Sequence, residues 1–323
     1  MMQRRSFMAA AAAAGFGWTG GAMAEGFPSR PITLVVPYAP GGNGDFTARA
    51  FGESFSRVLG QTVLVDNRSG SGGGIGAGYV ATSKPDGYTL IAAAKGVFAI
   101  TPNVVKVPYT MDNFTPIGFV SKTPMVLVVK KGSALRSLEA FAAEAKSRSG
   151  KLPMGIGAMG SDNHVAMLQL ELATGLQFNP VAYRGAAPML QDILSGQLEV
   201  GIYQLTTSKP FIEAGQLEAL AVLGMTQESS LPSVPTIARI GAEPLDSTTY
   251  IGVLAPRQTP APVVAVLQSA LKKALEDPKL NASFVKAGGA VYVAASPGEF
   301  ESRVRRESDF IKKMIQEGKV QKE

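Results

Sequence analysis

The sequence of 323 residues contains no cysteine and a single histidine, His164. Without cysteine the chain can form no disulfide, no thiolate nucleophile and no cysteine-ligated metal site. It also lacks an H-E-x-x-H helix and a G-x-S-x-G turn, so no pattern brings a nucleophile, a base and an orienting acid together. We therefore predict a protein that is not an enzyme and that needs no metal and no cofactor.

A strong charge bias is also missing. Residues 1–24 contain two arginines and no acid, which leaves 29 basic and 25 acidic residues in the rest of the chain, a net charge of +4. The one modest basic cluster fits the solvated face of an amphipathic helix and comprises Arg303, Arg305, Arg306, Lys312 and Lys313. We expect no nucleic-acid partner, because that footprint needs a basic stripe or a known motif.

The first 24 residues have the composition of a signal peptide. Arg4 and Arg5 precede an uncharged, alanine-rich run over 7–14, and Ala22-Met23-Ala24 forms a small-x-small end. The Arg-Arg-x-Phe start is similar to a twin-arginine signal, and Sec export fits as well. No later stretch reaches the roughly 18 apolar residues of a membrane-spanning helix. We expect a mature protein that begins at Glu25 and resides in the periplasm.

The remaining sequence alternates short apolar strands with helical patterns. Strands are predicted at 32–36, 62–65, 88–93, 125–129, 179–183, 200–203, 219–223 and 251–254. Helices are predicted at 46–59, 75–83, 138–148, 164–174, 188–194, 261–275, 278–286 and 297–317. This alternation indicates an α/β protein with parallel sheets covered on both faces.

We expect two doubly wound lobes with a cleft between them, because 323 residues suit two cores better than one. The predicted first lobe comprises 25–123 and 226–323, and the second comprises 124–225. The chain would cross between them near Thr123 and near Met225. Ligands in such folds bind at the carboxyl ends of the strands.

Four loops share one construction, in which a strand ends in small residues and a helix begins at once. They are Gly41–Asp45, Ser71–Gly76, Gly155–Asn163 and Gly185–Ala187, two in each predicted lobe. Small residues let the backbone approach a ligand, and the free N–H groups and dipole of a helix start attract negative charge. One such turn is common in any α/β fold, but four that converge would form an anion site.

Polar residues within these loops have local explanations as well. Asp45 and Asp162 lie where helix N-caps are expected, so capping is the predicted role of both carboxylates. His164 could donate a hydrogen bond to a ligand carboxylate, or it could serve as a local cap or surface residue.

One feature favours an enzyme. Gly155-x-Gly157-x-x-Gly160 has the spacing of a dinucleotide-binding turn. The strand before it contains Pro153, and no acid follows at the usual distance of about 20 residues. A nucleotide-dependent oxidoreductase is therefore the weaker alternative.

Several ordered motifs carry a family resemblance. They are Pro28-Ser29-Arg30-Pro31-Ile32, Val36-Pro37-Tyr38-Ala39-Pro40-Gly41-Gly42 with Asp45, Asn67-Arg68, Gly70-x-Gly72-Gly73-x-Ile75-Gly76, Asp86-Gly87-Tyr88-Thr89-Leu90, Tyr183-Arg184-Gly185 with Ala187-Pro188, Leu231-Pro232-x-Val234-Pro235-Thr236, and Leu254-Ala255-Pro256 with Thr259-Pro260-Ala261-Pro262. Over nearly the whole chain from Pro28, the sequence resembles the tripartite tricarboxylate transporter receptors, also called the Bordetella uptake gene or Bug family.

The resemblance implies a type II periplasmic binding protein fold. It further implies a monomer that holds a small carboxylate in the cleft, mainly through backbone amides and water, and presents it to membrane permease subunits or to a sensor kinase. The implied ligand contacts are Tyr38, Gly42, Asn43, Asp45, Gly73, Gly74, Ile75, Gly160, Ser161, His164, Ala186 and Ala187.

The sequence departs from the family pattern at three places. Asn43-Gly44 replaces the usual Ser-Thr, Gly74 replaces Asn, and Tyr203-Gln204 stands where Asp-Asn is frequent. An Asp at position 203 would suit the ammonium group of an amino-acid ligand, so Tyr203 argues against such a ligand. It favours an uncharged or aromatic ligand body that can stack on the ring or accept the phenol hydrogen bond, which makes Tyr203 a further predicted ligand contact. Alternatively, Tyr203 only fills space.

Overall fold

The computed structural model describes residues 26–159, 161–183, 185–243, 245–296, 298–320 and 322. The predicted signal peptide at 1–24, Gly160 and Arg184 lie outside these residues. Within the described ranges, every helix is too short or too polar to cross a lipid bilayer.

Six strands form the first sheet, in the order β11-β4-β10-β3-β1-β2. Their bounds are β1 Ile32–Val36, β2 Val63–Asn67, β3 Thr89–Ala94, β4 Phe114–Thr123, β10 Thr249–Pro256 and β11 Ala290–Val291. The helical segments connected to it are α1 Asn43–Leu59, η1 Ser71–Gly73, α2 Gly74–Ala81, α3 Gly96–Ala99, α4 Thr101–Val104, η2 Met111–Asn113, α9 Ala261–Leu275, α10 Pro278–Ala287 and α11 Glu299–Gln316.

Five strands form the second sheet, in the order β7-β6-β8-β5-β9. Their bounds are β5 Met125–Lys130, β6 Pro153–Ile156, β7 Asn179–Ala182, β8 Val200–Gln204 and β9 Leu217–Val222. The accompanying helices are α5 Leu138–Ser147, α6 Asp162–Thr174, α7 Ala186–Ser195, α8 Leu205–Glu213 and η3 Ile237–Ile240.

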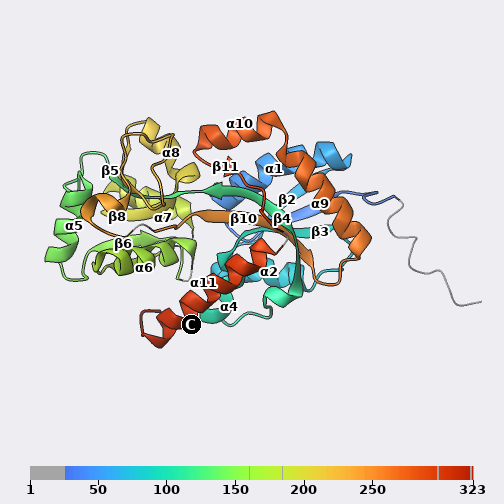
Figure 1. The fold of residues 1–323 in the computed structure, drawn as a ribbon, viewed down its shortest axis with the longest axis horizontal. Coiled ribbons are helices and arrows are strands. Elements are labelled where there is room, and N and C mark those ends of the chain that lie inside the picture. Colours follow the sequence, from blue (N-terminus) through green and yellow to red (C-terminus); the bar gives the residue numbers. More distant parts are fainter. Residues whose placement is uncertain are drawn as a thin grey trace, which may run out of the picture.

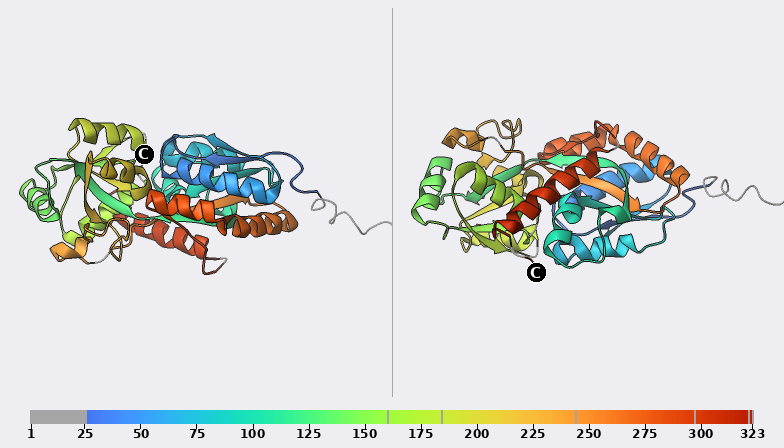
Figure 2. Two further views of the ribbon diagram at one scale, coloured as in Figure 1. Left: turned by 90° about the horizontal axis from the view of Figure 1, so that it is seen from above. Right: turned by 60° about the horizontal axis from the view of Figure 1, so that its bottom comes forward.

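The two sheets and their helices lie side by side in an elongated molecule, with the second sheet on the left of Figure 1 and the first on the right. Both views in Figure 2 show the same two bodies, and α11, drawn in red, runs obliquely between them. The α/β class and the two-sheet architecture predicted from the sequence are confirmed. We call the parts built on the first and second sheets the first and second halves.

The sheets are mixed rather than parallel, which corrects the sequence prediction. β1 pairs in parallel with β2 and β3, but β10 is antiparallel to both β3 and β4. In the second sheet, β6 is parallel to β7 and β8, whereas β5 is antiparallel to β8 and β9. β11 is likewise antiparallel to its neighbour β4. Two of the antiparallel strands, β5 and β10, are those through which the chain enters a sheet from the other half without a crossover helix.

The chain passes from the first half to the second at Pro124, between β4 and β5, and returns between β9 and β10. β4 and β10 are hydrogen-bonded to each other, and Thr123 is the register partner of Thr249. Both passages therefore leave the first sheet from neighbouring strands.

Buried apolar residues form three clusters. One belongs to the first half and packs α1 and α9 on the sheet through Phe51, Phe55 and Leu267. One belongs to the second half and contains Met189 and Ile193 of α7. The third contains residues of both halves. This continuity of apolar packing places the loops of the two halves against each other.

Candidate ligand-binding site

The first predicted loop leads directly into α1, and Gly42 occupies the N-cap position. Asp45 lies in the first turn of α1, so its predicted role as the N-cap is wrong. Its buried carboxylate accepts hydrogen bonds from Gly41 N at 3.0 Å and from Arg49 Nε at 3.0 Å. Burial opposes the charge, but these bonds hold the pKa of Asp45 below its ordinary value. The side chain therefore fixes the loop that precedes the helix.

Asn43 joins the two halves. Its side chain is 6% exposed, and its Oδ1 accepts hydrogen bonds from Thr123 Oγ1 at 3.2 Å and from Thr206 Oγ1 at 2.8 Å. Thr123 ends β4, whereas Thr206 lies in α8 of the second half. The side-chain oxygen of this predicted contact is therefore already used in a buried junction between the halves.

The second predicted loop packs against the first. A Cβ atom on Gly73 would lie 3.3 Å from Pro37 Cβ, and one on Gly76 would lie 2.9 Å from it. Gly73 has a φ of +94°, a conformation that favours glycine. Gly74 is buried against Val107, whereas the side chain of Ile75 is 55% exposed. This loop thus contributes backbone to the site.

The third predicted loop starts α6, and Ser161 rather than Asp162 is its N-cap. Ser161 Oγ accepts hydrogen bonds from Ala158 N at 3.2 Å and from His164 N at 3.3 Å. His164 is 1% exposed, and burial lowers its pKa to about 4, so the imidazole is neutral at pH 7. The predicted contact Gly160 lies outside the described residues.

Asp162 does not cap α6, so the capping role predicted from its position is wrong. Both of its carboxylate oxygens are buried, and they have no hydrogen-bond partner within the described residues. A Cβ atom on Gly96 would overlap Asp162 Oδ1. Since Gly96 begins α3 and Asp162 begins α6, the two halves touch at this point.

The fourth predicted loop reaches the first loop across the halves. Ala186 and Ala187 begin α7, with Ala186 half-buried and Ala187 exposed. A Cβ atom on Gly185 would lie 3.8 Å from Ala39 Cβ. The structure therefore brings the first loop together with the second and the fourth.

Tyr203 lies beneath the fourth loop. Its side chain is fully buried in the apolar cluster of the second half, and its hydroxyl donates a hydrogen bond to the Ala186 carbonyl at 3.4 Å. Of the two interpretations of its sequence position, this placement agrees with the space-filling one. The Tyr203 hydroxyl thus lies beside the backbone of the fourth predicted loop.

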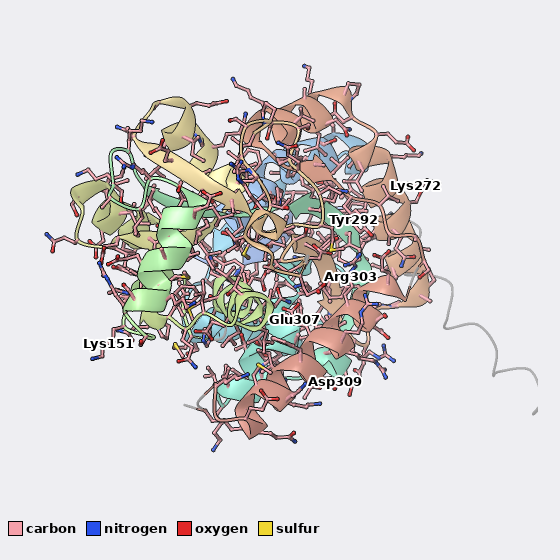
Figure 3. The ribbon with its side chains drawn as sticks, turned by 60° about the vertical axis from the view of Figure 1, so that its left-hand side comes forward. Lys151, Lys272, Tyr292, Arg303, Glu307 and Asp309 are labelled. Atoms are coloured by element: carbon pink, nitrogen blue, oxygen red, sulfur yellow. The ribbon has the colours of Figure 1, made fainter. Side chains whose placement is uncertain are left out.

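Lys95 is a basic residue at the site that the sequence analysis missed. It follows β3 directly, and its Nζ forms an ion pair with Glu307 of α11, the helix on which Figure 3 labels Glu307. Burial lowers the pKa of Lys95, but the charges of Glu307 and Asp162 outweigh this effect and raise it. The available signal was the sequence at 94–96, where a strand ends in a small residue and a helix begins at a glycine, as in the four predicted loops.

Tyr38 faces the same cluster from the first loop. Burial and then the charge of Asp162 raise the pKa of Tyr38 well above its ordinary value, so its phenol is protonated at pH 7. The charge of Asp162 in the second half thus acts on both Tyr38 and Lys95 in the first half.

Residues 47–319 match the family described as the tripartite tricarboxylate transporter family receptor. The chain belongs to this receptor family. The resemblance predicted from the sequence motifs is confirmed.

Solved structures support the same assignment for this receptor. The periplasmic binding protein BugD is 31% identical, covers 92% of this chain and 100% of its own, and has a TM-score of 0.84. A Rhodopseudomonas palustris protein solved with adipate, Rpa4515, is 31% identical with the same coverage and a TM-score of 0.85. MatC from Rhodopseudomonas palustris with bound malate is 28% identical, covers 90% of this chain and 100% of its own, and has a TM-score of 0.82. The receptor is thus similar to periplasmic solute-binding proteins over nearly its full length.

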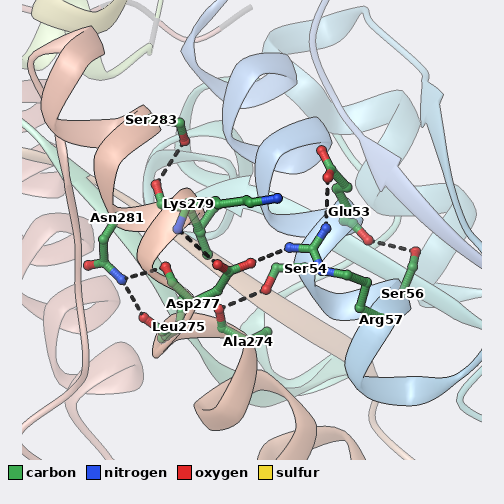
Figure 4. Close-up of polar contacts among 12 residues, drawn as sticks. Glu53, Ser54, Ser56, Arg57, Ala274, Leu275, Asp277, Lys279, Asn281 and Ser283 are labelled. Carbon is green, nitrogen blue, oxygen red and sulfur yellow. Dashed lines mark hydrogen bonds and ion pairs between the residues drawn. The ribbon is translucent and has the colours of Figure 1, made fainter.

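Two surface cavities of the receptor lie away from the predicted contacts. One of about 500 Å³ is lined by Met225, Thr226, Gln227, Pro232, Ser233, Pro235, Thr236 and Arg239. The other, of about 310 Å³, lies beside Arg57, which pairs with Glu53 and Asp277 and so ties α1 to the start of α10 (Figure 4). Neither cavity is lined by a predicted site residue.

The described residues contain no group of three His, Cys, Asp or Glu side chains placed to hold a metal ion. The arrangement at the site consists of helix starts, one buried lysine and one unpaired carboxylate.

Proposed function

We propose that this receptor captures a small organic carboxylate between its two halves and delivers it to the permease subunits of a tripartite transporter. One observation carries the proposal: strand-to-helix turns from both sheets meet where the halves touch. Gly185 approaches Ala39, and Asp162 approaches Gly96. A ligand held there would be enclosed from both sides.

The starts of α1, α2, α6 and α7 supply the chemistry for binding an anion. Each helix start has N–H groups without intrahelical partners and the positive end of the helix dipole. Such groups bind a carboxylate without a dedicated arginine. Lys95, which is paired with Glu307, lies close to these turns.

Two similar structures were solved with dicarboxylates, adipate in one and malate in the other. Their similarity over 90% or more of this chain supports a carboxylate ligand here. We therefore propose a receptor without enzymatic activity.

The test begins with a thermal-shift screen of mono-, di- and tricarboxylates, including aromatic ones, because a ligand that binds only the folded state raises the melting temperature. Titration calorimetry then compares wild type with Gly42→Val. Gly42 has φ −90°, and the atom nearest to an added Cβ is Ala39 O at 4.0 Å, so the free protein accommodates a side chain. The branched group would obstruct the N–H groups of α1, and we expect at least a hundredfold weaker binding, about 3 kcal/mol.

Gly298→Val is the matched control. Gly298 is the N-cap of α11, has φ −84°, and has no atom within 4 Å of an added Cβ. This variant should bind like wild type. Normal binding by Gly42→Val, or the absence of any carboxylate ligand from the screen, would contradict the proposed function.

A further inference from the structure

One side of α11 is a continuous stripe of exposed polar side chains. They recur every three or four residues, so they lie on the same face of the helix. This face, the α11 stripe, consists of Ser302, Arg305, Arg306, Asp309, Lys312, Lys313 and Gln316. At 1.5 Å per residue it is about 20 Å long. The opposite side of α11 is buried, so the helix is fixed to the molecule and presents the stripe outward.

The stripe concentrates the positive charge of the protein. Its four cations and one acid give a net charge of +3, whereas residues 25–323 together carry only +4. Arg305 and Arg306 form no ion pair with any described residue. Asp309, labelled in Figure 3, lies 3.6 Å from Lys312, and both side chains are exposed. Most of this charge is therefore available to a partner.

The charged residues beside the stripe are compensated locally. Arg303, which the sequence analysis grouped with these cations, donates a hydrogen bond from Nε to Glu299 at 2.8 Å. Glu317, which follows the helix, pairs with Lys319 at 2.9 Å. The net charge of +3 therefore belongs to the stripe itself.

The stripe has no apolar anchor. Within the described ranges, the large hydrophobic side chains that are exposed all lie on other elements than α11. A specific protein interface is built around buried aromatic or apolar residues and is depleted in lysine. A layer of lipid phosphates needs only positive charge, and each basic residue near an anionic membrane strengthens binding about fivefold. The composition thus favours a membrane surface over a protein surface.

α11 also connects the stripe to the candidate site. Glu307 projects from the buried side of the helix and pairs there with Lys95. A helix with its side chains is about 10 Å across, so Lys95 lies roughly one helix diameter behind the stripe. A receptor that rests on the stripe would hold its site close to the bilayer.

We propose that the α11 stripe docks the receptor on the anionic phospholipid headgroups of a membrane. The contact is peripheral and electrostatic, because every residue of the stripe is polar. It goes beyond the proposed function, since it uses another face of the molecule and requires no bound carboxylate.

Co-sedimentation with vesicles tests the docking. The purified receptor is mixed with vesicles of phosphatidylglycerol and phosphatidylcholine in equal amounts, or of phosphatidylcholine alone. A net charge of +3 predicts roughly 100-fold stronger binding to the anionic vesicles at low salt. The preference should disappear near 1 M salt, where the Debye length is about 3 Å.

Arg305→Gln combined with Arg306→Gln should weaken binding to the anionic vesicles about 25-fold. Both side chains are exposed and unpaired, so this variant should keep the melting temperature and the carboxylate affinity of wild type. The matched control is Lys130→Gln combined with Lys131→Gln, an adjacent exposed pair at the end of β5 in the second half. It loses the same charge and should bind the vesicles like wild type.

Three results would overturn the proposal. They are equal binding to both kinds of vesicle, equal losses in the two double variants, and binding to soluble polyglutamate in preference to the anionic vesicles. The last result would assign the stripe to an acidic protein. All three leave the proposed carboxylate receptor intact, because its ligand affinity is measured without a membrane.

Discussion

Adding one methyl group to Gly96 should weaken ligand binding by holding the halves apart. Gly96 is the first residue of α3, and an added Cβ would overlap Asp162 Oδ1 of the other half, far inside the roughly 3.3 Å of an ordinary C···O contact. The Asp162 side chain is short and both of its oxygens are buried, so it has little freedom to move aside. Alanine forms helices better than glycine, and the first half should fold normally.

The magnitude follows from the cost of overpacking. Inserting a methyl group into a tightly packed contact costs about 1–3 kcal/mol. Here the cost falls on the arrangement in which the halves touch, so it should appear in the affinity. At about 1.4 kcal/mol for each factor of ten, Gly96→Ala should bind roughly 5- to 150-fold more weakly.

Calorimetry with the best-binding acid of the carboxylate screen measures this loss, and Gly298→Ala serves as the control at a glycine with open space. Small-angle scattering should show that the ligand-dependent decrease in radius is smaller in Gly96→Ala. In an Asp162→Ala background, Gly96→Ala should add almost nothing, because the overlapping oxygen is gone. A full penalty in that background would place the clash at Ile100, whose Cδ1 lies 2.9 Å from the added atom, and would refute the reasoning.

Three further predictions concern stability. Burial lowers the pKa of His164 to about 4, against about 6.5 in the unfolded chain, so the unfolded state takes up the proton first as the pH falls. The free energy of unfolding should drop by about 3 kcal/mol between pH 6.5 and pH 4, and urea titrations of His164→Asn should lack this loss. Asn43→Ala should cost about 2 kcal/mol by leaving two buried hydroxyl donors without their acceptor, and adding Thr206→Val should then cost little; equal, additive losses would contradict the shared junction. Lys95→Met should cost about 3–5 kcal/mol at pH 7 by leaving Glu307 buried and unpaired. Thermal melts should recover part of this loss at lower pH, where the carboxyl group takes up a proton.

Local patterns predicted much of the fold. The strand at Ile32–Val36 has the predicted bounds, and α9 begins and ends where the sequence indicated. These elements were predictable because an apolar run, a glycine-rich turn or a proline marks each boundary in its own neighbourhood. The same marks identified the four loops, three of which the structure brings together through Pro37, Ala39 and Gly185.

Other elements were missed because their residues indicate the helix or strand only weakly, or disfavour it. α8 contains Pro210 and the run Leu205-Thr206-Thr207-Ser208, which is poor in helix formers, so its packing against α10 and the strands of the second sheet explains it. β4 carries Pro116 and Gly118, which interrupt a strand pattern. Both segments depend on partners that are distant in the sequence.

The candidate site, like the fold, was predictable only where local sequence patterns determine the structure. Gly160-Ser161-Asp162-Asn163 contains four residues that favour a cap, and the sequence does not distinguish among them. In the structure Ser161 is the N-cap, and the carboxylate of Asp162 points at Gly96 of the other half. A loop that was expected to present only N–H groups to an anion therefore also presents a carboxylate. Lys95 and Glu307 are far apart in the sequence, so no local sequence pattern could predict their ion pair.

The position of β10 determines the order in which the molecule can be completed. β10 lies between β4 and β3, so a chain that ends before Thr249 has two separate pieces of the first sheet, β4 alone and β3-β1-β2. The second sheet, by contrast, is complete once Val222 is present. The second half should therefore be the first autonomous folding unit, and residues 26–123 must wait with unpaired strand edges until the C-terminal segment arrives. Truncation after residue 224 should yield a protease-resistant fragment that begins near Met125.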